Sequence, residues 1–188
     1  MPRSEREKML AGEFYDAFDP ELIKSREKAR QLCGQLNNLS EEQGRERAEI
    51  LRNLLGSDSD AMIRAPFFCD YGTNIELGKG VYFNFNCVVL DVAKVRIGNK
   101  VLFGPNVQIY TAGHPLDAEE RRVGLEFGKE ITIGDDAWIG GSVIICPGVN
   151  IGARSVIGAG SVVTKDMPPD VIAAGNPCRV LQANSPKA

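Results

Sequence analysis

The chain has 188 residues and 43% hydrophobic content, which suits one main domain with a packed core. Its formal net charge of −3 argues against a dominant nucleic-acid-binding surface, and no apolar run approaches the roughly 20 residues that span a membrane. The N-terminal sequence MPRSEREKML is too charged for a secretory signal, and five cysteines without CxxC spacing favour free thiols over disulfides. We therefore expect a cytoplasmic protein that binds neither nucleic acid nor a membrane.

Residues 4–55 combine many Glu, Lys and Arg residues with interspersed Leu and Ile, a pattern that predicts about three helices. Several residues in this segment fit helix starts and ends. They are Ser4 with Glu7, Ser40 with Gln43, Asp19 before Pro20, and Gly56. A charge-rich helical segment usually forms a solvated cover, so we predict that residues 1–60 cap one end of the core.

A six-residue repeat replaces the helical pattern from Asn74 onward. Its large apolar residues are Leu77, Phe83 and Val89, then, after a slip of two residues, Ile97, Phe103 and Ile109, and later Ile133, Ile139, Ile145, Ile151, Ile157 and Val163. A period of six fits neither an amphipathic helix nor a long alternating strand, but it fits a solenoid whose stacked coils share an inward ladder. The chain is expected to turn at the glycines that follow ladder residues: Gly134, Gly140, Gly152 and Gly158.

Residues 111–130 interrupt the repeat. Because Ile109 and Ile133 are separated by a multiple of six residues, this segment can leave the solenoid as a loop and return in register. Long excursions from a rigid scaffold often carry function. This one contains His114, the only histidine, directly before Pro115. From position alone, a lone histidine is as often a structural or surface residue as a functional one.

The repeat, together with IGDDAWIG, the PGV of residues 147–149, GAGSVVTKD and AAGNPCRV, resembles the hexapeptide-repeat acyltransferases and is most similar to the maltose and galactoside O-acetyltransferases. The resemblance covers nearly the whole chain, to about residue 182. It implies a mainly β protein, in which residues 61–182 form a left-handed parallel β-helix with a protruding loop at 111–130 and residues 183–188 form a flexible tail. It also implies acetyl-CoA as co-substrate and a homotrimer with active sites at the subunit interfaces.

The resemblance also implies roles for residues of the reaction centre. His114, in the GHP motif, is then the general base, which contributes about 10²–10⁴-fold to the rate. The backbone N–H of Gly141 is the candidate donor to the oxyanion. Asn84, in the NFN motif, also belongs to the active site. Glu126, in GLEFGKE, orients the base or binds the sugar, or is only a solvated loop charge.

Two further groups of residues follow from the same resemblance. The residues expected at the acceptor are Asp16, Arg26, Asp70 with Tyr71, Tyr82, Asn84 and Asp91. The residues expected at CoA are Trp138, Gly141, Ala159, Thr164, Lys165 and Arg179, with Lys165 and Arg179 meeting phosphates. Galactoside-specific relatives carry methionine at the position of Glu126 and aspartate at that of Val92. Both departures favour a maltose or glucose type of acceptor.

The sequence therefore predicts direct transfer of an acetyl group from acetyl-CoA to a sugar hydroxyl. Two alternatives stay open, because one fold carries many functions. The acceptor could be an antibiotic, such as chloramphenicol or a streptogramin, or serine, or the solenoid could be a non-catalytic scaffold. A cysteine nucleophile is disfavoured because no cysteine neighbours the histidine in sequence. We expect no metal, since a zinc enzyme of this repeat class needs three histidines.

Overall fold

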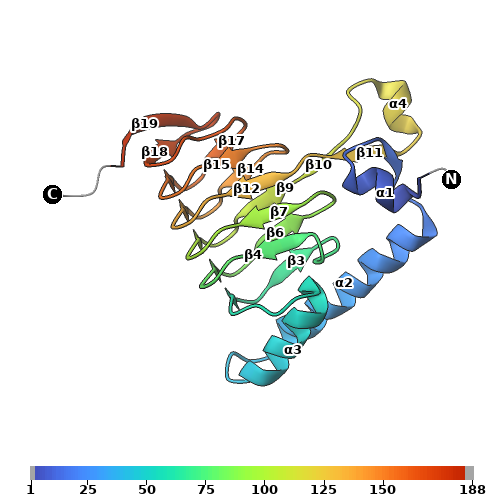
Figure 1. Cartoon of the computed structure of the whole chain (residues 1–188), viewed down its shortest axis with the longest axis horizontal. Coiled ribbons are helices and arrows are strands. Elements are labelled where there is room, and N and C mark those ends of the chain that lie inside the picture. The colour runs from blue at the N-terminus through green and yellow to red at the C-terminus, as the bar shows by residue number, and fades with distance from the viewer. Residues whose placement is uncertain (1–2, 185–188) are drawn as a thin grey trace.

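The computed structural model describes residues 3–184 as a solenoid of short parallel strands with helices at its N-terminal end (Figure 1). The helices are α1 (Glu5–Leu10), α2 (Pro20–Asn38), α3 (Gly44–Leu55) and α4 (Ala118–Arg122). The strands are β1 (Tyr15–Asp16), β2 (Met62–Ile63), β3 (Phe67–Cys69), β4 (Ile75–Leu77), β5 (Tyr82–Phe83), β6 (Cys87–Leu90), β7 (Val95–Ile97), β8 (Leu102–Phe103), β9 (Gln108–Tyr110), β10 (Ala112–Gly113), β11 (Leu125–Gly128), β12 (Ile131–Ile133), β13 (Trp138–Ile139), β14 (Ile144–Ile145), β15 (Asn150–Ile151), β16 (Val156–Ile157), β17 (Val162–Val163), β18 (Val171–Ala174) and β19 (Arg179–Ala183). Most of the predicted tail, residues 185–188, lies outside the described residues.

Each of the first four coils of the solenoid contributes one strand to each of three sheets. The four-stranded sheet has the order β15-β12-β7-β4, the five-stranded sheet β17-β14-β9-β6-β3, and the seven-stranded sheet β19-β18-β16-β13-β8-β5-β2. Within these three sheets only β18 and β19 pair antiparallel among the described residues. The fold is thus a parallel β-helix with three faces, as the repeat predicted.

The inward ladder follows the predicted hexads. Ile133 pairs in parallel with Ile97, and Ile145 pairs with Ile109, so the chain returns in register after the excursion. The rings of Phe83 and Phe103 stack with centroids 4.2 Å apart inside the solenoid. Because every coil places an apolar side chain at these positions, the core is continuous along the solenoid.

The first coil begins earlier than the repeat suggested. Strand β2 at Met62 already pairs in parallel with β5, whereas the hexads start at Asn74. The coil departs from the repeat because it is also covered by α2. The side-chain amide of Asn37 on α2 donates to the Phe67 carbonyl at 3.0 Å and accepts from the Phe67 N–H at 2.9 Å. The helical segment therefore satisfies backbone groups at the end of the solenoid.

The helix boundaries agree with most of the predicted caps. Ser4 and Glu7 form a capping box, Asp19 caps α2 ahead of Pro20, and Gly56 ends α3 with a φ of 72°. The predicted box at Ser40 and Gln43 is wrong. Gln43 Oε1 accepts from the Ser40 N–H at 3.0 Å, but the Ser40 hydroxyl faces Gln43 Oε1 at 3.3 Å and caps no backbone N–H, so α3 begins at Gly44.

The glycines after ladder residues have a different role from the predicted one. The left-handed turn residue comes two positions later, for example at Asp136 with a φ of 56°. Gly134 instead lies where the next coil passes, because a Cβ on it would be 2.5 Å from the Ala153 nitrogen. These positions need glycine for close backbone approach rather than for positive φ.

The close approach of Ala153 to Gly134 predicts that two Gly→Ala substitutions change the free energy of unfolding in opposite directions. Gly134→Ala should lower the free energy of unfolding by about 1–3 kcal/mol, because rigid backbone must move. Gly34→Ala should raise it by about 0.5–1 kcal/mol, since Gly34 lies within α2 and a Cβ there meets nothing within 4 Å. Urea unfolding of both variants and the wild type at one protein concentration measures the difference. Equal effects of the two substitutions would contradict the packing argument.

Candidate functional site

Two long edges of the solenoid border the five-stranded sheet. At the first, which we call the Asn84 edge, the chain passes from the seven-stranded to the five-stranded sheet, and Asn84, Gly141 and Ala159 lie in its turns. At the second, the His114 edge, the chain passes from the five-stranded to the four-stranded sheet. The excursion 111–130 leaves the solenoid at this second edge and lies beside α1 (Figure 1).

The excursion is largely structured. Strand β11 is the middle strand of a small antiparallel sheet, with β10 on one side and β1 of the N-terminal cap on the other. His114 comes directly after β10. Because both neighbours of β11 are hydrogen-bonded to it, the segment around His114 is held by the solenoid side and the cap side together.

The polar partners of the His114 ring both come from β11. His114 Nδ1 lies 3.3 Å from the Leu125 carbonyl oxygen, and Nε2 lies 3.9 Å from Glu126 Oε1. A carbonyl oxygen only accepts, so this contact requires the hydrogen on Nδ1, and in that tautomer of the neutral ring Nε2 keeps its lone pair. The side chain of His114 is 52% exposed. The structure therefore presents an accessible basic nitrogen next to a carboxylate.

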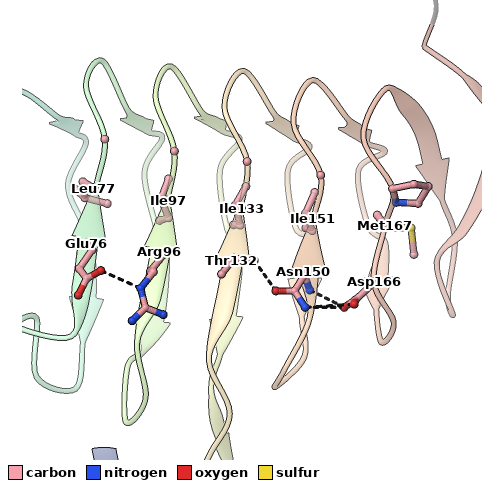
Figure 2. A pocket seen from close by; sticks show the side chains of 15 residues that line it. Glu76, Leu77, Arg96, Ile97, Thr132, Ile133, Asn150, Ile151, Asp166 and Met167 are labelled. Carbon is pink, nitrogen blue, oxygen red and sulfur yellow. Dashed lines mark hydrogen bonds and ion pairs between the residues drawn. The ribbon is translucent and has the colours of Figure 1, made fainter.

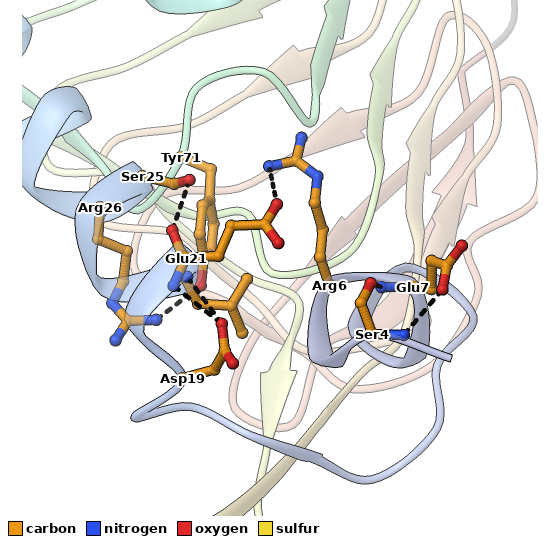
Figure 3. A network of polar contacts seen from close by, with 9 residues as sticks. Ser4, Arg6, Glu7, Asp19, Glu21, Ser25, Arg26 and Tyr71 are labelled. Atoms are coloured by element: carbon orange, nitrogen blue, oxygen red, sulfur yellow. Dashed lines mark hydrogen bonds and ion pairs between the residues drawn. The ribbon is translucent and has the colours of Figure 1, made fainter. Parts of the chain in front are cut away.

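Candidate acceptor residues gather on the same edge beneath the cap. Arg26 on α2 donates to the Tyr71 hydroxyl at 2.7 Å and to the Ala17 carbonyl at 2.5 Å, and Figure 3 shows its side chain reaching Tyr71 from the helix. Asp70 lines a cavity of about 410 Å³ between α2 and the five-stranded sheet. Burial raises the pKa of the Asp70 carboxyl, while the Arg26 guanidinium opposes this and the Glu126 carboxylate adds to it. Asp16 is exposed at the end of β1.

The burial of Asp91 argues against its predicted contact with the acceptor. Its side chain is fully buried, and its oxygens accept from the N–H groups of Asp70 at 3.0 Å, Tyr71 at 2.9 Å and Asn74 at 3.4 Å. It lies in the extra turn residues that cause the phase slip of the repeat. Asp91 thus holds the turn that carries Asp70 and Tyr71. Burial, despite these hydrogen bonds, raises the pKa of Asp91 to about 7.

The raised pKa predicts a pH-dependent stability. The folded-state pKa of about 7 exceeds the ordinary 3.8, so the contribution of Asp91 is fully present below pH 3.8 and is lost as the pH rises through about 7. The amide introduced by Asp91→Asn does not titrate. We expect the free energy of unfolding of the wild type, relative to Asp91→Asn, to fall from pH 4 to about pH 8. A relative stability that stays constant or rises over this range would contradict the burial effect.

The remaining predicted residues lie away from His114 in the same chain. Tyr82, Trp138 and Arg179 belong to strands of the seven-stranded sheet, where Trp138 is 55% exposed and pairs with Leu102 in register. Thr164 and Lys165 follow β17 on the His114 edge, in a later coil. One chain therefore brings together His114, Glu126 and the acceptor cluster, but leaves the Asn84 edge on the far side of the five-stranded sheet.

Sequence reasoning missed one residue of this site. Tyr15 is 1% exposed, and its hydroxyl donates to Glu126 Oε2 at 2.7 Å. It precedes Asp16 in the GEFYDAF segment, which was assigned to the acceptor pocket through Asp16 alone. The signal that could have found Tyr15 is an apolar aromatic residue inside a charged segment.

A separate open groove of about 820 Å³ follows the four-stranded sheet (Figure 2). Its polar side chains pair with one another: Arg96 Nε lies 3.1 Å from Glu76, and the Asn150 amide donates to Asp166 at 3.2 Å. The residues that line it include no histidine or cysteine. Despite its size, the groove is lined by none of the predicted site residues.

Burial disfavours Cys87, Cys146 and Cys178 as nucleophiles, because it raises the pKa of each of these thiols. All five cysteines are free, in agreement with the prediction, and burial raises the pKa of Cys87 to about 11. Within residues 3–184, no group of three or more His, Cys, Asp or Glu side chains is arranged to hold a metal ion. No helix in that range has the length and apolar character needed to cross a membrane.

Known families match two parts of the chain. Residues 8–58 match the maltose acetyltransferase hexapeptide capping motif, and residues 130–165 match the bacterial transferase hexapeptide, a model of six repeats. The first match runs from within α1 through β1 and α2 to the end of α3, and the second covers the uninterrupted hexads.

Solved structures match nearly the whole chain. A maltose O-acetyltransferase from Clostridium difficile is 49% identical with a TM-score of 0.95, and the match covers 98% of this chain and 99% of that one. A hexapeptide-repeat acetyltransferase from Vibrio cholerae, complexed with acetyl coenzyme A, is 42% identical with a TM-score of 0.90 over 98% and 100% of the two chains. A galactoside acetyltransferase in complex with coenzyme A is 37% identical with a TM-score of 0.93 over 98% and 92%.

Proposed function

Because the chain belongs to the hexapeptide-repeat acetyltransferases of the maltose and galactoside kind, we propose that it moves an acetyl group from acetyl-CoA directly to a hydroxyl of a maltose- or glucose-type sugar. One observation carries this proposal. The only histidine of the chain presents Nε2 beside Glu126, on the edge where the cap gathers Asp70, Arg26 and Tyr71. The carboxylates accept hydrogen bonds, the guanidinium donates them and the phenol does both, so together they match the hydroxyls of a sugar, which donate and accept.

In the proposed reaction His114 Nε2 removes the proton of the sugar hydroxyl as that oxygen attacks the thioester carbonyl. The backbone N–H of Gly141 stabilises the oxyanion that forms. When the carbon–sulfur bond breaks, the imidazolium returns its proton to the CoA thiolate. The Glu126 carboxylate, 3.9 Å from Nε2, stabilises the positive charge while the ring is protonated.

The proposed assembly is a homotrimer whose five-stranded sheets face the threefold axis. The outward residues of this sheet are mainly apolar: Phe68, Val88, Gln108, Ile144 and Val162. Phe68 is 47% exposed in the single chain, which favours a partner on this face. The His114 edge and the Asn84 edge are the two borders of the five-stranded sheet. When the five-stranded sheets of three subunits surround a threefold axis, the His114 edge of one subunit therefore lies beside the Asn84 edge of the next. Asn84 and Gly141 then join a neighbouring His114.

CoA lies in this arrangement along the outer, seven-stranded face of the neighbouring subunit. Trp138 and Leu102 form an exposed apolar strip there, at 55% and 48% exposure, against which the flat parts of CoA can pack. Ala159 at the adjoining edge allows close approach, and Arg179 of the same subunit binds a phosphate. Thr164 and Lys165 reach CoA from the His114 edge of the first subunit, where Lys165 meets a phosphate. Free thiols support a cytoplasmic location, where acetyl-CoA is available.

The test is CoA release from acetyl-CoA, followed with a thiol reagent, over maltose, glucose, a galactoside, serine and chloramphenicol. We expect the highest kcat/KM with glucose or maltose. Turnover with serine or chloramphenicol alone would keep the acetyl transfer and overturn the sugar acceptor. No release with any acceptor, together with no acetyl-CoA binding by calorimetry, would favour the non-catalytic scaffold.

A further inference from the structure

The N-terminal cap makes a direct contact with the residues around His114. Strand β1 pairs with β11 so that Tyr15 is opposite Glu126 and Asp16 is opposite Leu125. Glu126 and Leu125 are the two residues whose oxygens lie next to the His114 ring. The cap thus contacts both partners of the histidine, although Tyr15 and Glu126 are 111 residues apart in the chain.

The packing and the hydroxyl of Tyr15 favour one orientation of the Glu126 side chain. Its ring packs in a small separate core with Met9, Leu22, Tyr71 and Val92 between the cap and the solenoid. From there its hydroxyl donates to Glu126 Oε2 at 2.7 Å, which leaves Oε1 facing His114 Nε2. Burial, followed by the contact with Glu126, raises the pKa of the Tyr15 phenol, so that it remains a donor at every physiological pH. A buried phenol has few rotamers, whereas a partly exposed glutamate such as Glu126, whose side chain is 24% exposed, has more.

We propose that Tyr15 is a positioning residue of the reaction, which acts through Glu126 by fixing one carboxylate oxygen so that the other faces the Nε2 atom of His114. This inference rests on the proposed acetyl transfer at His114. It gives the cap a part in proton transfer in addition to its contacts with the acceptor. No covalent step involves Tyr15, and its proton stays on the phenol throughout.

The first test is a double-mutant cycle of Tyr15→Phe and Glu126→Ala. Tyr15→Phe keeps the ring in its core and removes only the hydroxyl. We expect kcat to fall about tenfold, since one hydrogen bond to a charged group is lost, with the KM for acetyl-CoA unchanged within about twofold. In the Glu126→Ala background the same substitution should have no further effect on kcat. An equal tenfold fall in both backgrounds, or no fall in the wild-type background, would overturn the proposal.

A second readout does not depend on activity. His114 is the only histidine, so its ring nitrogen signals in NMR of the full-length protein need no assignment between residues. Tyr15→Phe and Glu126→Ala should each move these signals, and the double variant should match Glu126→Ala. If the enzyme proves inactive on every acceptor but the signals move as expected, the proposed function fails while the contact stands. If the His114 signals do not move in Tyr15→Phe, the proposed effect of the Tyr15–Glu126 contact on His114 is rejected.

Thr132→Val is the matched control. The Thr132 hydroxyl donates to Asn150 Oδ1 on the four-stranded sheet and makes no contact with Glu126. Its removal should leave kcat within about twofold and the His114 signals in place, since no partner of the base is altered. A fall in kcat as large as that of Tyr15→Phe would show that loss of an unrelated hydroxyl weakens the enzyme equally, which would reject a specific role for Tyr15.

Discussion

His114→Ala is expected to lower kcat for acetyl transfer by about 10²–10⁴-fold, because the substitution removes the proposed base, which would accept the proton of the acceptor hydroxyl. The loss should appear in kcat rather than in the KM for acetyl-CoA, since the proposed role of His114 is on the acceptor oxygen in the transition state. The side chain is 52% exposed and makes one long contact through Nδ1, so its removal should change the unfolding temperature little. CoA release with the best acceptor of the panel measures the loss.

Glu120→Ala is a control in the same excursion. Glu120 lies on α4, is exposed, and belongs to no part of the proposed reaction centre. This variant should keep its activity. If His114→Ala retained more than about a tenth of the wild-type kcat, general-base catalysis by His114 would be untenable, because this form of catalysis contributes at least about 10²-fold.

The ladder of the solenoid could be predicted from the sequence because it depends on local spacing. Ile133 pairs with Ile97 simply because the excursion preserves the hexad phase. The hexads do not predict the start of the solenoid at Met62, because the first coil is bonded to α2 as well as to its neighbouring coil. Gly134 was recognised as a special position, but the reason is an approach to Ala153 on another coil, which no local pattern encodes.

The same distinction applies to the candidate site: residues that are close in sequence could be predicted together, and residues that the fold brings together could not. His114 and Glu126 share one short segment, so the motif that contains them already suggested that they act together. Tyr15 joins them only through pairing across 111 residues, and Asp91 changes role because its turn folds inward. Long-range pairing and burial depend on the whole fold. These two properties decide whether a polar residue can contact a ligand or instead makes hydrogen bonds that stabilise the fold.

Mixing two inactive variants should restore activity if the site is shared between subunits. Asn84 and His114 lie on opposite borders of the five-stranded sheet, so each proposed site takes His114 from one subunit and Asn84 from the next. In trimers assembled at random from equal amounts of His114→Ala and Asn84→Ala chains, a site is intact when its first subunit keeps His114 and its second keeps Asn84. Each condition holds for half of the chains, so about one quarter of the sites should work.

Co-refolding of the two purified variants, followed by CoA release per subunit, measures this recovery against each variant refolded alone. His114→Ala mixed with Glu126→Ala is the matched control. These two residues lie 3.9 Å apart in one chain, so mixing repairs no site and activity should not exceed the mean of the parent variants. Recovery in the first mixture alone would support a site built across the interface. Failure of the first mixture, with mixed trimers verified, would contradict a site that takes His114 from one subunit and Asn84 from the next, because subunit exchange would have restored such a site.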